Sequence, residues 1–341
     1  MRPTVHDIAK RAGVSLATVD RVLNRRAGVR AATAARVQAA IAALGYQRDL
    51  AAANLAKSRL YPLVFILPEG PNAFMRGLEG AVQEARQRSA ADRTDISLVT
   101  VPPFDEVALA RALDALDPKQ LAGVALVATE SPAVRRAVAR LADAGLPVVT
   151  LVSDLPNARR GHYVGIDNVA AGRTAASLLG RFIGGRKGKV AVLAGSLLVR
   201  DHVERRLGFD QVVRAEFPFL DVLPVVEGFD EAETARRVIG ECLDREKDVI
   251  GIYSLGAGNR GLIEALAERD LAGKVTVVAH ELTDHARAAL ADGTFAAVIN
   301  QDAGHEVRSA IRVMKALADG VALVDAQERI RIDIFVRDNL P

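Results

Sequence analysis

Residues 4–24 read Thr4-Val-His-Asp-Ile-Ala-Lys-Arg-Ala-Gly-Val-Ser-Leu-Ala-Thr-Val-Asp-Arg-Val-Leu-Asn24. Thr4 and Ser15 are side chains that cap helix N-termini, and each precedes apolar residues at helical spacing. Gly13, between them, suits a tight turn. We therefore predict two short helices joined by a turn, with a third amphipathic helix over residues 31–44. This is a helix-turn-helix, whose second helix enters the major groove of DNA. The first helix should bury Val5, Ile8 and Ala9.

Charge is distributed unevenly along the chain. Residues 1–60 contain eleven Lys and Arg against Asp7, Asp20 and Asp49, which makes this head +8. The whole chain is +3, so the remaining residues carry −5. A basic head on an acidic body is typical of proteins that bind nucleic acid phosphates. The charge argues against the alternative, a small helical bundle with no nucleic-acid role.

The head resembles the lac repressor (LacI/GalR) family of transcription regulators, and the resemblance continues nearly to the end of the chain. Its signature is the run from Val5 to Asn24, continued by Val29-Arg, Thr33, Arg36-Val and Leu44-Gly-Tyr46. The resemblance implies that duplex operator DNA is the partner. It further implies a DNA-binding set with three base-reading and three backbone-positioning side chains, to which we add the helix-capping Thr4. The base readers are Leu16, Ala17 and Arg21, and the backbone-positioning residues are Ser15, Thr18 and Asn24.

Arg21 is the strongest base reader of this set, because a guanidinium can pair bidentately with guanine O6 and N7. Leu16 and Ala17 can offer only apolar contact, for instance to a thymine methyl group. Most family members have Ser where this chain has Asp20. Its carboxylate could accept from cytosine N4 or pair with a neighbouring Arg, and we favour the intramolecular pair.

Residues 48–61 form an Ala-rich segment that is too short to be a stable helix alone in water. The resemblance implies a hinge helix that orders only on operator DNA. Leu55 matches the position of a Leu that wedges into the minor groove in the family. Such a wedge would make the folding of the linker depend on the correct DNA.

From Pro62 onward, β-branched runs of four to six residues alternate with amphipathic helical stretches, which indicates parallel sheets covered by helices on both faces. The runs cover residues 63–67, 96–101, 124–127, 148–152, 190–193, 249–253, 275–278, 295–299 and finally 330–336. Residues 62–341 are too many for one such sheet, so we expect the body to have two lobes.

The fold class predicted for the whole chain is an all-α helix-turn-helix head followed by an α/β body. The resemblance implies that this body is periplasmic-binding-protein-like and has two Rossmann-like lobes. The expected domains are 1–47 (DNA-binding head), 48–61 (hinge) and 62–341 (effector-binding body). One lobe would contain about 62–163 and 301–326, and the other about 164–300 and 327–341, with crossings near Tyr163, Asn300 and Ala326.

A ligand should sit between the lobes, at the carboxyl ends of the strands. Polar side chains that follow strands are the candidate contacts, together with an arginine and an apolar wall that match ligand-binding positions of the family. They are Asp154, Glu281, Gln301, Arg205, Phe74 and Met75, with His280 as a weaker candidate. Carboxylates accept from hydroxyl groups, Arg donates to oxygens, and Phe covers an apolar sugar face. The set predicts a sugar, polyol or sugar acid as effector.

A rival prediction comes from Gly256-Ala-Gly-Asn-Arg-Gly261, which fits the G-x-G-x-x-G pattern of dinucleotide-binding loops. Gly256, Gly258 and Gly261 follow a strand, and Glu281 stands twenty residues beyond the last of them. The alternative is therefore an NAD-binding redox-sensing regulator or dehydrogenase. The same loop has Leu255-Gly256 where many relatives carry Asn-Asp, which would remove a polar contact to the effector.

We expect no enzyme activity, no cofactor and no metal site, since no catalytic partner or zinc-ligand spacing is evident. No apolar run reaches the roughly twenty residues that a membrane span needs, and Arg2 is followed by a charged helix rather than the apolar core of a signal peptide. The lone Cys242 permits no internal disulfide. These features indicate the cytoplasm. The chain ends without a heptad tail, so we expect a homodimer with two heads on a pseudo-palindromic operator.

Overall fold

The computed structural model describes residues 3–23, 26–46, 59–256 and 258–341. The chain divides into two compact units, Met1–Arg59 and Leu60–Pro341. The first unit contains helices α1 (Val5–Ala12), α2 (Leu16–Leu23) and α3 (Ala31–Leu44). Gly13 ends α1 in a left-handed conformation with φ 63°, as the turn requires. The hydrophobic core of this first unit contains Ile8, Ala9, Ala12, Val19, Val37 and Ala40. Val5 is 37% exposed, so the buried face of α1 begins one turn later than predicted.

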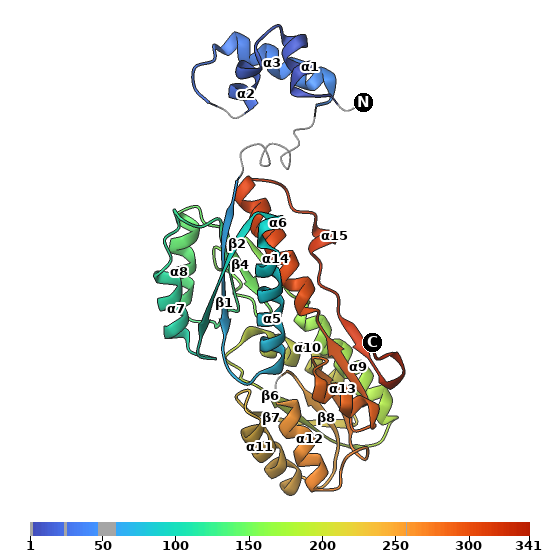
Figure 1. Cartoon of the computed structure of the whole chain (residues 1–341). Helices are drawn as coiled ribbons and strands as arrows, with labels where there is room; N and C mark the ends of the chain where they lie inside the picture. The colour runs from blue at the N-terminus through green and yellow to red at the C-terminus, as the bar shows by residue number, and fades with distance from the viewer. Residues whose placement is uncertain (1–2, 24–25, 47–58, 257) are drawn as a thin grey trace. The chain divides into compact units, whose positions relative to one another are not determined.

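The second unit contains two sheets, each with helices on both faces. The first sheet is parallel, in the order β2-β1-β3-β4-β5. Helices α5 (Ala73–Gln87) and α14 (Ala303–Asp319) lie on one face, and α7 (Glu106–Asp114) and α8 (Pro132–Asp143) lie on the other (Figure 1). The short α6 (Ser89–Asp92) precedes β2. The strands are β1 (Tyr61–Pro68), β2 (Thr94–Val101), β3 (Gly123–Leu126), β4 (Val148–Leu151) and β5 (His162–Val164).

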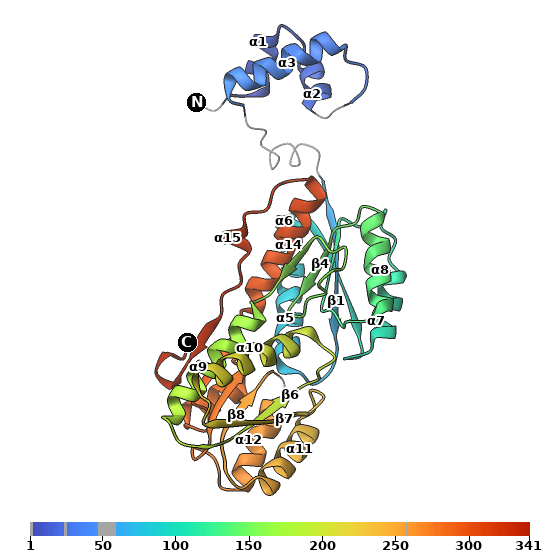
Figure 2. The ribbon, with the colours of Figure 1, turned by 180° about the vertical axis from the view of Figure 1, so that it is seen from behind.

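The second sheet has the order β11-β10-β9-β8-β6-β7, with only β11 antiparallel to its neighbour. Helix α9 (Asn168–Ile183) packs on one face with α10 (Arg200–Glu216) against it, whereas α11 (Ala232–Arg245), α12 (Asn259–Glu268) and α13 (Asp284–Ala291) cover the other (Figure 2). The strands are β6 (Gly188–Ala194), β7 (Leu220–Glu227), β8 (Val249–Ser254), β9 (Thr276–His280), β10 (Ala297–Asn300) and β11 (Asp333–Phe335). The predicted fold class, a helical head and a two-lobed α/β body, is confirmed.

Three connections join the two lobes: β5 to α9, β10 to α14, and α14 through α15 (Asp325–Glu328) to β11. The last connection is anchored by Glu328, whose carboxylate accepts from Arg312 at 2.9 and 3.1 Å and from the Ser309 hydroxyl. Apolar packing is continuous between the lobes, since one core cluster includes Phe65 of β1 together with Phe209 of α10. The carboxyl ends of both sheets therefore face a shared cleft whose walls belong to one folded unit.

Helices α9 and α10 touch backbone to backbone. A methyl group at Gly172 would lie 1.9 Å from the carbonyl oxygen of Arg205, and one at Gly208 would lie 2.0 Å from that of Val169. Glycine is required at both positions because any side chain would push the helices apart. This contact positions the first two turns of α10, from which several side chains enter the cleft.

We predict that Gly208→Ala destabilises the body by about 1–3 kcal/mol. The added methyl group would clash with backbone atoms of α9, which can move away only if the two helices shift apart. Gly80→Ala on α5 is the matched control, since a methyl group there meets no atom within 4 Å. The control should stabilise the protein by about 0.5–1 kcal/mol through helix propensity. Urea unfolding of both variants tests this. Equal effects of the two substitutions would contradict the account of the α9–α10 contact.

Candidate DNA-binding surface and effector site

Helix α2 presents the predicted base-reading side chains outward. Leu16, Ala17 and Arg21 are exposed, and the Leu16 side chain is 43% exposed although it is large and apolar. Ser15 caps the helix, with its hydroxyl accepting from the backbone N–H of Thr18 at 3.2 Å. The N-terminal turn of α2 is therefore built as a groove-reading surface needs, with its apolar side facing the head core and its readers in solvent.

Other predicted residues of the head are placed as follows. Thr4 caps α1 in a capping box with Asp7, so its hydroxyl supports the helix start. Asp20 pairs with Arg26, with 3.4 Å between carboxylate and guanidinium, which is the intramolecular pair predicted for this departure. Asn24 and Leu55 lie outside the described residues.

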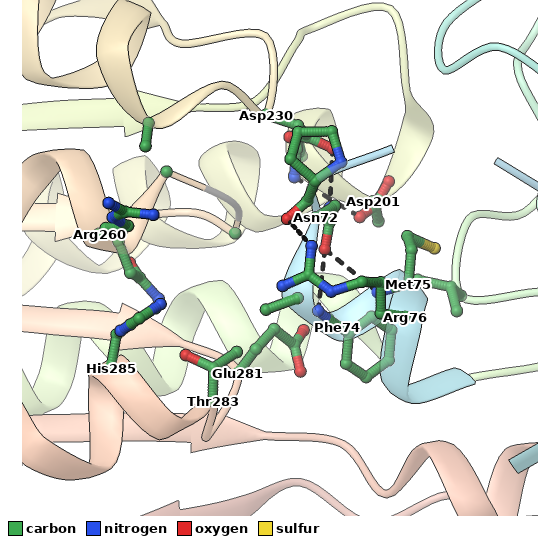
Figure 3. Close-up of a pocket in the computed structure, with 18 of the residues that line it drawn as sticks. Asn72, Phe74, Met75, Arg76, Asp201, Asp230, Arg260, Glu281, Thr283 and His285 are labelled. Carbon is green, nitrogen blue, oxygen red and sulfur yellow. Dashed lines mark hydrogen bonds and ion pairs between the residues drawn. The ribbon is translucent and has the colours of Figure 1, made fainter. Parts of the chain in front are cut away.

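A cavity of about 190 Å³ lies between the two lobes at the carboxyl ends of their strands (Figure 3). One wall is the loop after β1 and the start of α5, and the other is formed by α10 and the segments that follow β7, β8 and β9. The polar and aromatic side chains that line it are Asn72, Phe74, Arg76, Asp201, His202, Arg205, Asp230, Asn259, Arg260, Glu281, Thr283 and His285, with Met75 beside them.

Arg205 is the charged centre of this site and is only 1% exposed. Its Nε donates to Asn168 Oδ1 at 2.9 Å, and its Nη1 donates to the carbonyl oxygen of Leu255 at 2.7 Å. Its Nη2 makes no hydrogen bond, lying 3.5 Å from Glu281 Oε1 and 4.0 Å from Asp201 Oδ2. Burial alone would lower the pKa of Arg205, but these two carboxylates outweigh burial and raise it. The guanidinium therefore stays charged and keeps one donor group for a ligand.

Glu281 follows β9 and is 6% exposed. Its Oε1 accepts from Gln301 Nε2 at 2.8 Å, whereas its Oε2 has no partner. The residue adopts φ 68°, a left-handed conformation that costs free energy for a non-glycine residue and is often found at binding sites. Burial raises the pKa of Glu281 to about 7, although Arg205 and Gln301 act in the opposite direction. Gln301 is 2% exposed; its amide holds the Glu281 carboxyl group, and it lines an adjoining hollow of the cleft together with Phe74 and Glu281.

Two further carboxylates line the cavity that the sequence did not predict. Asp201 precedes Arg205 by one helical turn on α10, and its Oδ1 has no partner. Asp230 follows β7; its Oδ2 accepts from Asn72 Nδ2 of the other lobe at 2.7 Å, and its Oδ1 has no partner. Burial raises the pKa of Asp230. The spacing of four residues between Asp201 and Arg205 could have predicted that both side chains lie on one face of the helix. Asp230 was missed because the sequence analysis did not predict β7, the strand that it follows.

Two predicted effector contacts need correction. The Asp154 carboxylate is engaged by Arg160, by the Thr150 hydroxyl at 2.7 Å and by the Leu155 N–H at 2.7 Å, and it does not line the cavity. Burial alone would raise the pKa of Asp154, but the bonds from Arg160 and Thr150 lower it. Asp154 thus organises the loop after β4. His280 is fully buried behind the site, where its Nε2 and the Tyr253 hydroxyl are 2.9 Å apart, and burial lowers its pKa well below the usual range.

The described glycines of the glycine-rich loop have packing roles of their own. Gly261 is needed for helix packing, because a methyl group there would lie 2.0 Å from the carbonyl oxygen of Ala232 on α11. A methyl group at Gly256 would lie 2.5 Å from the imidazole of His202, so this backbone faces a side chain. The carbonyl oxygen of Leu255 accepts from Arg205 at 2.7 Å. The alternative of an NAD-dependent protein is therefore not supported.

Comparison with known proteins assigns both parts of the chain. Residues 4–49 match the bacterial regulatory proteins of the lacI family, and residues 63–322 match the periplasmic binding protein domain. The chain belongs to the lacI family of bacterial regulatory proteins. Its body, which makes up most of its length, is a periplasmic binding protein domain.

Relatives agree with this assignment. The HTH-type transcriptional regulator DegA of Bacillus subtilis (strain 168) is 25% identical over 248 residues, which cover 72% of this chain and 71% of DegA. The ribose operon repressor of Escherichia coli (strain K12) is 30% identical over 128 residues, 38% of each chain. The crystal structure of GanP, a glucose-galactose binding protein from Geobacillus stearothermophilus, superimposes with a TM-score of 0.74 at 22% identity, covering 83% of this chain and 99% of GanP. This last likeness shows a shared fold.

Two absences hold for the described part of this lacI-family chain. None of its helices combines the length and apolarity needed to cross a membrane. In the same residues, no group of three or more His, Cys, Asp or Glu side chains has an arrangement suited to a metal ion.

We predict a pH-dependent stability term from Glu281. Its pKa is raised from 4.5 to about 7, so the folded state binds more protons between these values. The stability from this group is therefore fully present below about pH 4.5 and is lost as the pH rises to 7. Between pH 5 and pH 8, the ligand-free protein should lose roughly 2–3 kcal/mol more unfolding free energy than Glu281→Gln does. Urea unfolding at both pH values measures this; parallel pH profiles would show that Glu281 is already ionised at pH 5.

Proposed function

We propose that this protein is a sequence-specific DNA-binding transcription regulator, acting as a repressor, whose operator affinity is set by a small effector held between the two lobes of its body. One observation supports the proposal. The chain combines a head whose helix α2 turns its predicted base-contacting side chains to solvent with a body whose cavity is lined by buried polar atoms that have no hydrogen-bond partner. Buried unpartnered groups are costly, and a ligand that pairs with them would recover that cost.

The chemistry of the cavity supports a sugar, polyol or sugar-acid effector. Asp201, Asp230 and Glu281 offer acceptors for hydroxyl groups, and Arg205 offers a donor. Phe74 presents an aromatic ring to the cavity, which can cover an apolar sugar face (Figure 3). The ribose operon repressor and the glucose-galactose binding protein GanP are named for sugars of this class.

Effector binding would act by stabilising the closed arrangement of the lobes. Asn72 bonds to Asp230 across the cleft at 2.7 Å, and the Arg200 N–H bonds to the Ser153 hydroxyl at 3.1 Å. A ligand contacting both walls adds to these bridges and so favours closure. Operator binding must then change effector affinity by the same factor as the effector changes operator affinity.

The proposed assembly is a cytoplasmic homodimer, in which two heads read a pseudo-palindromic operator. The proposed division of the chain is a head of residues 1–47, a hinge of 48–61 and an effector-binding body of 62–341. Leu55 in the hinge would enter the minor groove. No catalytic step is part of the proposal.

We predict that Arg21→Ala weakens binding to the operator by about 1–3 kcal/mol and relaxes preference at one base pair, because a bidentate contact to guanine is lost. Arg237→Ala is the matched control, since Arg237 is an exposed body residue paired with Glu241 on α11. Binding assays with operator and base-substituted fragments would measure both. A uniform loss of affinity on every sequence would make Arg21 a phosphate contact instead.

We predict that Arg205→Lys retains operator binding but lowers the affinity for the effector by about ten- to a hundredfold, since the lysine ammonium group cannot reproduce the hydrogen-bond geometry of the guanidinium. Arg206→Lys is the control on the same helix, because Arg206 pairs with Asp210 and does not line the cavity. Operator titrations with and without effector provide the readout. If no small molecule changes operator affinity of the wild-type protein, the proposed function fails.

A further inference from the structure

Among the charged side chains that line the cavity, the carboxylates are more deeply buried than two of the three guanidiniums. Three carboxylates line the cavity, from Asp201, Asp230 and Glu281; Asp201, Glu281 and the guanidinium of Arg205 are buried, and Asp230 is half-buried. The other two lining guanidiniums are exposed. Arg260 is 64% exposed and pairs with Glu264, whereas Arg76 donates to the carbonyl oxygen of Pro71. Figure 3 shows Arg260 next to His285, across the cavity from Asn72 and Asp230.

The charge on the buried side chains is unbalanced in the absence of a ligand. If all three carboxylates are ionised, the buried Arg205 leaves a formal excess of two negative charges, which only the exposed Arg76 and Arg260 of the lining offset. The raised pKa values of Glu281, about 7, and of Asp230 are the expected consequence of burial with too few cations. Glu306, fully buried on α14, has no hydrogen bond to either carboxylate oxygen, and burial together with the charge of Glu281 raises its pKa well above the usual range.

The pattern of unpartnered atoms has a specific chemical complement. Each of the three lining carboxylates has one oxygen beside a protein cation or donor and a second without a hydrogen bond, namely Asp201 Oδ1, Asp230 Oδ1 and Glu281 Oε2. An ammonium group has three N–H donors and one positive charge. A sugar acid would add a negative charge beside these carboxylates, and a neutral sugar would leave the excess in place.

We propose that the effector is a polyhydroxylated compound carrying a protonated amine, an amino sugar or amino polyol, whose ammonium group lies against Asp201, Asp230 and Glu281. Its hydroxyl groups accept from Arg205, and its apolar face lies on Phe74. The cavity of about 190 Å³ has room for a compound of about the size of one sugar ring. This inference rests on the proposed function, because it takes the cavity as the effector site, and it excludes the sugar-acid option.

The test is a set of matched ligands on the full-length protein in phosphate buffer at pH 7. D-glucosamine, D-glucose and D-glucuronate form one triplet, and the corresponding galacto compounds form a second. Tris, pentaerythritol and 2,2-bis(hydroxymethyl)propionate form a minimal triplet with amine, alcohol and acid. Thermal shift followed by calorimetric titration should show an amine bound about tenfold or more tightly than its alcohol, with the acid weakest, because charge-assisted hydrogen bonds are the stronger ones.

Variants separate the charge effect from general damage. Asp201→Asn and Glu281→Gln keep the side-chain shape but remove a charge, so each should reduce the preference for the amine over the alcohol. Glu241→Gln removes an exposed carboxylate on α11 outside the cavity and should leave the preference unchanged.

The pH dependence gives a second readout on the wild-type protein. As Glu281 begins to ionise between pH 5.5 and pH 7, where the amine ligands remain protonated, affinity for the amine should rise and affinity for an acid should fall. The groups that face Glu281 are the charged Arg205 and Asp201 on α10, the amide of Gln301 after β10 and the carboxyl of Glu306 on α14.

An alcohol or acid that binds as tightly as its amine overturns the proposal, and so does the absence of binding by every amine at millimolar concentration. If a neutral sugar binds as tightly as its amine and changes operator affinity, only this inference fails. If ligands bind but none changes operator affinity, the proposed function fails instead.

Discussion

A buried guanidinium must be matched by acceptors, and the body of this lacI-family protein is organised around one, Arg205. Arg205 draws its partners from separate parts of the second lobe: Asn168 at the start of α9, the Leu255 carbonyl after β8, and Glu281 after β9. The backbone contact of α9 with α10 holds the helix that carries it. Because removing one partner of a buried ion pair leaves an uncompensated charge, this network fixes the geometry of the site.

The same network is incomplete, and this makes it responsive. Arg205 Nη2 and one oxygen each of Asp201, Asp230 and Glu281 have no hydrogen-bond partner. Hydrogen bonds join the lobes at Asn72–Asp230 and Ser153–Arg200, and a ligand that pairs with the remaining groups of both walls adds to the free energy of closure. A regulator needs such a balance, since a ligand can shift an equilibrium only by its difference in affinity for the two states.

Local patterns predicted the fold, and long-range contacts limited the prediction of the site. The head was predictable because its caps, turn and apolar spacing all lie within 45 residues. Among the strands, β5 is only three residues long, and β7 contains Asp221 and Pro224, so neither stands out as an apolar run. Asp154 follows a strand, as a ligand-binding residue would, but its pairing with Arg160 depends on the fold of the intervening loop. The role of Gly261 is set by α11, about thirty residues earlier, and the sequence pattern alone suggests a dinucleotide loop instead.

The most direct test of the account is a crystal structure of the protein with its effector bound. The account predicts ligand donors within hydrogen-bond distance of Asp201 Oδ1, Asp230 Oδ1 and Glu281 Oε2, and a ligand acceptor on Arg205 Nη2, with the Asn72–Asp230 bridge or a ligand-mediated equivalent closing the cleft. A ligand bound elsewhere, with these four atoms still unpartnered or paired only with water, would contradict it.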